Sequence, residues 1–283
     1  MFKRQRTGSV VCPGCGYLVG VNDDRCYNCG RWNPSMWGFS PFIRSLGQDL
    51  GFVYTIMGGT IALYVVMLVL SGPNVRTSML SPLAPSPEIQ FLFGASGGYP
   101  VFVLHRWWTI FSAGWLHAGV LHIFFNLLWV RQLGPETSEL YGPGRTVIIY
   151  TAAGACGFAF SSILFLLVGQ LPVIGGAPLT VGASAPIFGM LGAHVCYSHR
   201  TGSRLAGAVA WQYAVIMFIF GLIMPGVDNA AHAGGFAGGY LCAYLLNPSK
   251  AERMEHLLAA ILCLVVTAAS LAASVILGMP YLR

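Results

Sequence analysis

From residue 52 onward, long apolar runs alternate with short polar connections. The apolar runs cover residues 52–70, 110–130, 146–168, 184–198, 207–225, 229–246 and 257–279. A helix that crosses a bilayer needs about 20 residues, and most of these runs reach that length. The pattern therefore predicts an all-α polytopic membrane protein.

Composition and charge favour the same class. Of the 283 residues, 55% are hydrophobic and 8% are charged, whereas soluble domains carry about 25% charged residues. Twelve of the fifteen Lys and Arg residues lie in residues 1–51, 131–145, 199–206 and 247–256. Cytoplasmic loops collect such cations, so we expect a multi-pass protein of a bacterial plasma membrane, with a cytoplasmic N-terminus and an outer C-terminus. The same distribution argues against nucleic acid as a partner. No cleavable leader follows the basic first residues, so we expect the first apolar run to be retained.

Two Cys-x-x-Cys pairs precede the apolar runs. They consist of Cys12 with Cys15 and Cys26 with Cys29, and a glycine follows each pair. This spacing predicts a structural Zn²⁺ held by four thiolates. Residues 1–32 would then form a small zinc-ribbon-like module that depends on the metal to fold. Two disulfides are the alternative, which the reducing side of a membrane disfavours.

The four remaining cysteines are scattered through the apolar runs, where we expect small core side chains. They are Cys156, Cys196, Cys242 and Cys263. Residues 33–51 are predicted to be a linker with interfacial Trp and Phe side chains. The long connection over residues 71–109 is rich in apolar side chains, so we expect it to lie in the membrane interface.

Polar side chains interrupt the second apolar run, which we expect to form one helix over residues 110–130. Ionisable residues inside a membrane are costly and therefore indicate function. His122 and Asn126 are four residues apart and share a helix face, whereas His117 would point elsewhere. A structural hydrogen bond is an equally good explanation for His117.

The fourth run is too short to cross the bilayer. Its fifteen residues, 184–198, span about 22 Å of a hydrocarbon core about 30 Å thick. The glycine-rich residues 175–182 before it must then dip into the membrane and line a wet cavity. Ser184 begins this helix, where free main-chain N–H groups favour a developing negative charge.

A serine nucleophile needs a base, and the sixth run supplies His232. Gly235 and Gly239 are spaced as in helices that pack very closely, and His232 lies on the same face. The second, fourth and sixth runs all point from outside to inside in the predicted topology. Their polar residues therefore share one depth near the outer surface.

Three motifs now stand in order along the chain: HxxxxHxxxN, GxSx and AHxxGxxxG. They are carried by His117, His122 and Asn126; by Gly182 and Ser184; and by Ala231, His232, Gly235 and Gly239. On these motifs the chain resembles the rhomboid family of intramembrane serine proteases over roughly residues 50–246.

The resemblance implies a six-helix catalytic core over residues 52–246 and one additional C-terminal transmembrane helix within residues 247–283. It implies Ser184 as nucleophile and His232 as general base, without a carboxylate and without a cofactor for catalysis. It also implies an oxyanion hole formed by His122, Asn126 and the N–H of Ser184. The expected substrates are transmembrane proteins, cleaved within the lipid bilayer near its outer face.

Two positions depart from the family pattern. Ala185 and Pro186 follow the serine, where relatives usually carry glycine. The family's Trp-Arg signature is replaced by Trp108-Thr109, with Arg106 out of register.

Three alternatives stay open at this point. Ser96 lies in a closer match to the serine motif, although no apolar helix follows it. A catalytically inactive rhomboid-like scaffold that binds transmembrane helices would share the fold. A transporter would need paired broken helices in two halves of the chain, and only residues 175–183 predict a break at the start of a helix.

The zinc-ribbon-like module would face a cytosolic partner, the inner helix ends or a substrate.

Overall fold

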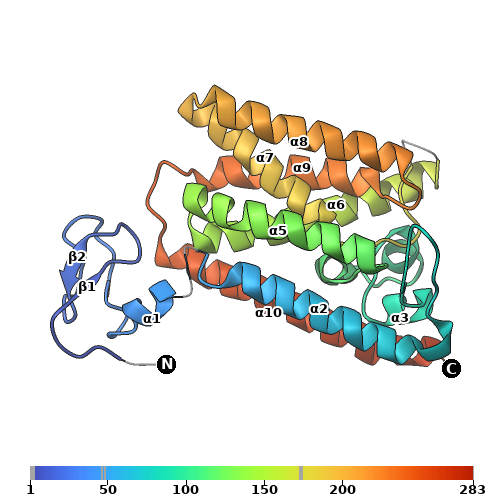
Figure 1. Cartoon of the computed structure of the whole chain (residues 1–283), viewed down its shortest axis with the longest axis horizontal. Coiled ribbons are helices and arrows are strands. Elements are labelled where there is room, and N and C mark those ends of the chain that lie inside the picture. The colour runs from blue at the N-terminus through green and yellow to red at the C-terminus, as the bar shows by residue number, and fades with distance from the viewer. Residues whose placement is uncertain (1–3, 46, 48, 172–174, 283) are drawn as a thin grey trace.

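The computed structural model describes residues 4–45, 47, 49–171 and 175–282. A few positions of the predicted module, linker, core and C-terminal segment lie outside the described residues. They are residues 1–3, 46, 48, 172–174 and 283. A bundle of long helices makes up most of the molecule, and a small hairpin lies beyond one end of it (Figure 1). The predicted all-α fold with a small N-terminal module is confirmed.

Six of the seven apolar runs each form one long helix, and the second forms a bent pair. The long helices are α2 (Phe52–Ser71), α5 (Val120–Tyr141), α6 (Pro143–Val168), α7 (Ser184–Thr201), α8 (Arg204–Ile223), α9 (Asn229–Leu246) and α10 (Met254–Gly278). Among the described residues, three helical spans are long and apolar enough to cross a membrane by themselves: Phe52–Asn74, Pro143–Val168 and Met254–Tyr281. The bent pair would make a fourth.

Helix α7 lies inside the bundle and packs most extensively against α9. Any Cβ at Gly235 or Gly239 of α9 would clash with the main chain of Ala185 or Gly189 of α7. The two helices therefore approach to backbone contact through small residues. This close approach brings the first turns of α7 and α9 together.

The expectation of one continuous helix over residues 110–130 is wrong. The segment contains α4 (Thr109–Ser112), the 3₁₀ turn η3 (Ala113–Trp115) and a bend of 93° before α5 begins at Val120. The break frees main-chain groups that hold the loop before Ser184, since the N–H of Gly182 donates to the carbonyl of Ala113 at 3.0 Å. An apolar pattern cannot reveal such a bend, because both sides of it remain buried.

The connection over residues 71–109 is folded onto the bundle. It contains η1 (Gly72–Asn74), α3 (Pro87–Leu92) and the π-helical turn η2 (Tyr99–Val103). Ser96 forms an antiparallel bridge with Thr180, with N–H to carbonyl distances of 3.0 and 2.7 Å. The connection over residues 71–109 and the loop before Ser184 therefore support each other.

The N-terminal hairpin pairs β1 (Ser9–Val11) with β2 (Leu18–Gly20) in an antiparallel register. An isolated bridge between Arg25 and Trp32 flanks the second cysteine pair. The small core of this N-terminal segment contains Val10, Val19, Val21, Cys12 and Cys26. The short helix α1 (Ser40–Ser45) follows and leads toward α2.

Candidate active site

Ser184 and His232 meet where α7 and α9 begin. The Nε2 atom of His232 lies 2.8 Å from the Oγ atom of Ser184. The imidazole is buried and stacks on the ring of Phe188, with centroids 4.3 Å apart and an angle of 14° between planes. Phe188 follows Ser184 by one helical turn, so the same helix carries the hydroxyl and fixes the ring that faces it. The serine has a proton acceptor within reach.

The other nitrogen of His232 is also occupied. Its Nδ1 atom lies 3.0 Å from Oδ1 of Asn229, which precedes it on the same helix face. The amide nitrogen of Asn229 donates to the carbonyl of Phe218 in α8 at 3.3 Å. Sequence reasoning missed Asn229, although a polar residue three positions before a candidate base is a readable signal.

His122 lies on the other side of Gly182. Its Nδ1 atom accepts a hydrogen bond from the N–H of Ala118 at 3.4 Å, so the neutral ring carries its proton on Nε2. A Cβ at position 182 would lie 2.6 Å from this Nε2 and 3.8 Å from Oγ of Ser184. Gly182, at φ +131°, therefore leaves room for a ring donor near the serine hydroxyl.

Asn126 and His117 both contact His122. The amide of Asn126 is buried and donates to the carbonyl of His122 at 2.8 Å. His117 lies in the bend rather than on α5, and its Nε2 accepts from the N–H of Ala183 at 3.4 Å. Its ring also meets that of His122 edge to face. His117 thus contacts the loop before Ser184.

A family model described as the Rhomboid domain matches residues 104–249, which is more than half of the chain. The chain belongs to the rhomboid family. Members of this family are multi-pass membrane proteins and usually intramembrane serine proteases that act on transmembrane substrates.

Three relatives illustrate the range of this similarity. RHOMBOID-like protein 7 of Arabidopsis thaliana is 32% identical over 168 residues, which cover 58% of this chain and 50% of the relative. Rhomboid protease GluP of Bacillus subtilis (strain 168) is 32% identical over 161 residues, which cover 56% of this chain and 30% of the relative. Rhomboid-like protease 1 of Toxoplasma gondii is 28% identical over 174 residues, which cover 59% of this chain and 56% of the relative. The chain thus spans about half or less of the length of the first curated relatives that it matches.

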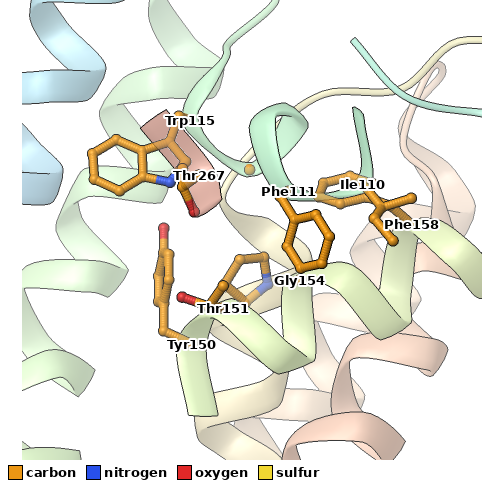
Figure 2. Close-up of a pocket in the computed structure, with 10 residues that line it drawn as sticks. Ile110, Phe111, Trp115, Tyr150, Thr151, Gly154, Phe158 and Thr267 are labelled. Atoms are coloured by element: carbon orange, nitrogen blue, oxygen red, sulfur yellow. The ribbon is translucent and has the colours of Figure 1, made fainter. Parts of the chain in front are cut away.

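Ala185 and Pro186, which follow the serine of this rhomboid protein, fit against helix α6 because two glycines of that helix face them. A Cβ at Gly157 would lie 2.8 Å from the methyl group of Ala185, and one at Gly154 would lie 3.0 Å from the ring of Pro186. Pro186 also lines a cavity of about 10 Å³. Figure 2 labels Tyr150 and Thr267 among the other residues that line it. Such a cavity holds about one water, so it cannot receive a substrate.

Ser96, the alternative serine, has a structural environment. It is fully buried, its main chain is paired with Thr180, and its Oγ lies 3.3 Å from Oγ1 of Thr109. Within the part of the chain that the structure describes, its hydrogen-bond partners are Thr109 and Thr180, and neither side chain is a base. The structure does not favour Ser96 as a nucleophile.

The four N-terminal cysteines of the rhomboid protein come together. Their sulfur atoms lie within 4.8 Å of one another, with Cys12 to Cys29 at 3.8 Å and Cys15 to Cys26 at 3.5 Å. Four thiolates around Zn²⁺ at about 2.3 Å would be about 3.8 Å apart, whereas a disulfide requires about 2.05 Å. The N–H of Cys29 points at the sulfur of Cys26 and is the main cause that lowers the pKa of this thiol to about 7, whereas burial raises the pKa of the Cys12 and Cys29 thiols. The cluster could hold a metal ion.

Proposed function

We propose that this rhomboid protein is an intramembrane serine endopeptidase with Ser184 as nucleophile and His232 as general base. The observation that carries the proposal is the 2.8 Å contact between Nε2 of His232 and Oγ of Ser184. Oγ attacks the scissile carbonyl while Nε2 takes its proton, and the imidazolium then gives that proton to the leaving amine. Water, activated by the same imidazole, hydrolyses the acyl-enzyme.

The tetrahedral intermediate needs donors for its negative oxygen. We assign this role to the Nε2–H of His122, the amide of Asn126 and the main-chain N–H of Ser184. The protonated nitrogen of His122 lies beside Gly182, two residues before Ser184, which supports this assignment. Helix α7 also begins at Ser184, so its free N–H groups favour the developing charge.

The proposed substrates are transmembrane segments that unwind locally near the outer face of the membrane. Loop charge supports a cytoplasmic N-terminus and an outer C-terminus, and we propose a bacterial plasma membrane as the location. The proposed organisation is a module over residues 1–32, a linker over 33–51, a catalytic core over 52–246 and an added helix within 247–283. We assign a structural Zn²⁺ to the module and no cofactor to catalysis.

The test is cleavage of a model transmembrane substrate by purified protein in detergent, together with labelling by a fluorophosphonate. Wild type should cleave and be labelled, Ser184→Ala should do neither, and Ser96→Ala should still be labelled if it folds. A wild-type protein that neither cleaves nor is labelled, yet binds transmembrane helices, would be the inactive scaffold instead.

A further inference from the structure

We propose that Asn229 is a positioning residue that fixes the tautomer of His232, so that the working unit is Ser184–His232–Asn229. This inference rests on the proposed catalytic role of His232. The side chain of Asn229 bonds to His232 and to the carbonyl of Phe218, not to the serine. It acts through the imidazole, whose Nδ1 lies 3.0 Å from the amide oxygen.

The orientation of the Asn229 amide follows from its second contact. The carbonyl oxygen of Phe218 can only accept a hydrogen bond, and the nearer amide atom is Nδ2, at 3.3 Å. The amide oxygen is therefore left to face His232 and can only accept. Nδ1 of His232 must then carry the ring's proton, which leaves Nε2 as a bare acceptor for the hydroxyl of Ser184.

A glycine in helix α8 makes room for the side-chain amide of Asn229. A Cβ at Gly221 would overlap Oδ1 of Asn229 and would lie 3.0 Å from its amide carbon. Glycine at position 221 therefore leaves the space that the amide occupies between α8 and α9. The orientation of His232 thus depends on a second helix that carries neither member of the dyad.

A neutral amide suits this environment better than a carboxylate. Asn229 is buried, and an unpaired charge there would be costly to desolvate. When Nε2 takes the serine proton, both ring nitrogens become donors, and the amide oxygen continues to accept from Nδ1. The neighbouring carboxylate of Asp228 is used elsewhere, since it accepts from Ser161 and from the N–H of Ala231.

The direct readout is the ¹⁵N NMR spectrum of the His232 ring, assigned by its loss in His232→Ala. Wild type should show a protonated Nδ1 and a bare Nε2. Asn229→Ala and Gly221→Ala should both show a mixture of tautomers, with kcat lowered roughly 10–100-fold and KM little changed. Asn229→Asp keeps an acceptor oxygen toward Nδ1 and should therefore keep Nδ1 protonated. Its buried charge and the lost donor to the carbonyl of Phe218 should lower thermal stability.

A matched control separates this effect from a general loss of packing. A Cβ at Gly207, on the same helix α8, would overlap the hydroxyl of Ser198, far along the helix from Asn229. Gly207→Ala should lower thermal stability while leaving the His232 spectrum as in wild type. A wild-type spectrum and kcat in Asn229→Ala, or the same tautomer mixture in Gly207→Ala and Gly221→Ala, would overturn the proposal. Absence of cleavage by wild type would reject the protease function alone, because the tautomer is read without substrate.

Discussion

The guanidinium group of Arg106 donates a hydrogen bond of 2.8 Å to the main-chain carbonyl oxygen of Ser274 in α10. The same group donates to the carbonyl of Phe91 at 3.1 Å and lies over its ring. The indole N–H of Trp108 reaches the hydroxyl of Ser274 at 3.1 Å. Helix α10 thereby anchors the connection over residues 71–109, which in turn pairs with the loop before Ser184 through Ser96. The added C-terminal helix is part of the frame of the candidate site.

Arg106→Ala should therefore destabilise the protein. Arg106 is only 2% exposed, and its loss leaves the buried carbonyl of Ser274 and the part-buried carbonyl of Phe91 without a charged donor. We expect the free energy of unfolding to fall by about 2–3 kcal/mol. Ser274→Ala is the matched control, because it removes a hydroxyl but keeps the carbonyl, and should cost about 1 kcal/mol. Thermal unfolding in detergent compares them, and equal losses would contradict the role given to Arg106.

The arginine shows what sequence alone could and could not supply. Residue types and spacing suggested Ser184 and His232 on closely packed helices and His122 with Asn126 on one helix face. The resemblance to the rhomboid family then joined them into one site. The role of Arg106 could not be read in this way, since its partner Ser274 lies 168 residues away. The bend before α5 was missed for a different reason. Most of its residues are apolar on both sides of the turn, and the one ionisable side chain in it, His117, was read as a functional signal, so hydropathy does not mark where the chain turns.

Gly182→Ala should abolish activity while the helices remain folded. The added methyl group would lie 2.6 Å from Nε2 of His122, and φ +131° disfavours any side chain. The ring would have to leave the place next to Ser184. Gly169→Ala is the control, since Gly169 also has a positive φ but nothing within 4 Å of its missing Cβ. Cleavage assays and circular dichroism on both variants test the claim, and an active Gly182→Ala would refute it.

His122→Ala and Asn126→Ala should slow turnover without preventing substrate binding. Loss of one donor to the oxyanion typically costs about 10²–10³ in rate, or roughly 3–4 kcal/mol. The two variants should show lowered kcat with substrate affinity close to wild type. A defect confined to binding at both positions would remove these side chains from the oxyanion hole.

Pro186 and Gly154 should be energetically coupled. A methyl group at position 154 would press on the proline ring at 3.0 Å, a contact tighter than ordinary packing. We expect Gly154→Ala to cost about 1–3 kcal/mol, and less when Pro186→Ala is also present. A double-mutant cycle from thermal unfolding measures this coupling. Simple additivity would show that the glycine does not serve to accommodate the proline.

The four-cysteine cluster should bind one Zn²⁺ that takes no part in the chemistry. Cys12, Cys15, Cys26 and Cys29 would fill all four positions of a tetrahedral ion and leave none open for water or substrate. The hairpin that carries the first pair lies beyond the end of the bundle opposite α3 (Figure 1). Metal analysis of wild type and of Cys12→Ser with Cys15→Ser tests the ligands. Equal zinc content in both proteins would reject them.

Separation of metal from chemistry has a further consequence. If a bilayer core of about 30 Å lies between the cluster and Ser184, deletion of residues 1–40 should leave cleavage of a model substrate largely intact in detergent. Stability or substrate choice in cells can still change, because the module would then act on a cytosolic partner or on the inner helix ends. Gentle zinc chelation of the full chain should likewise spare catalysis. If chelation abolished cleavage while α2 to α10 stayed folded by circular dichroism, the metal would have to act on the active site, and the assignment of Zn²⁺ as purely structural would be wrong.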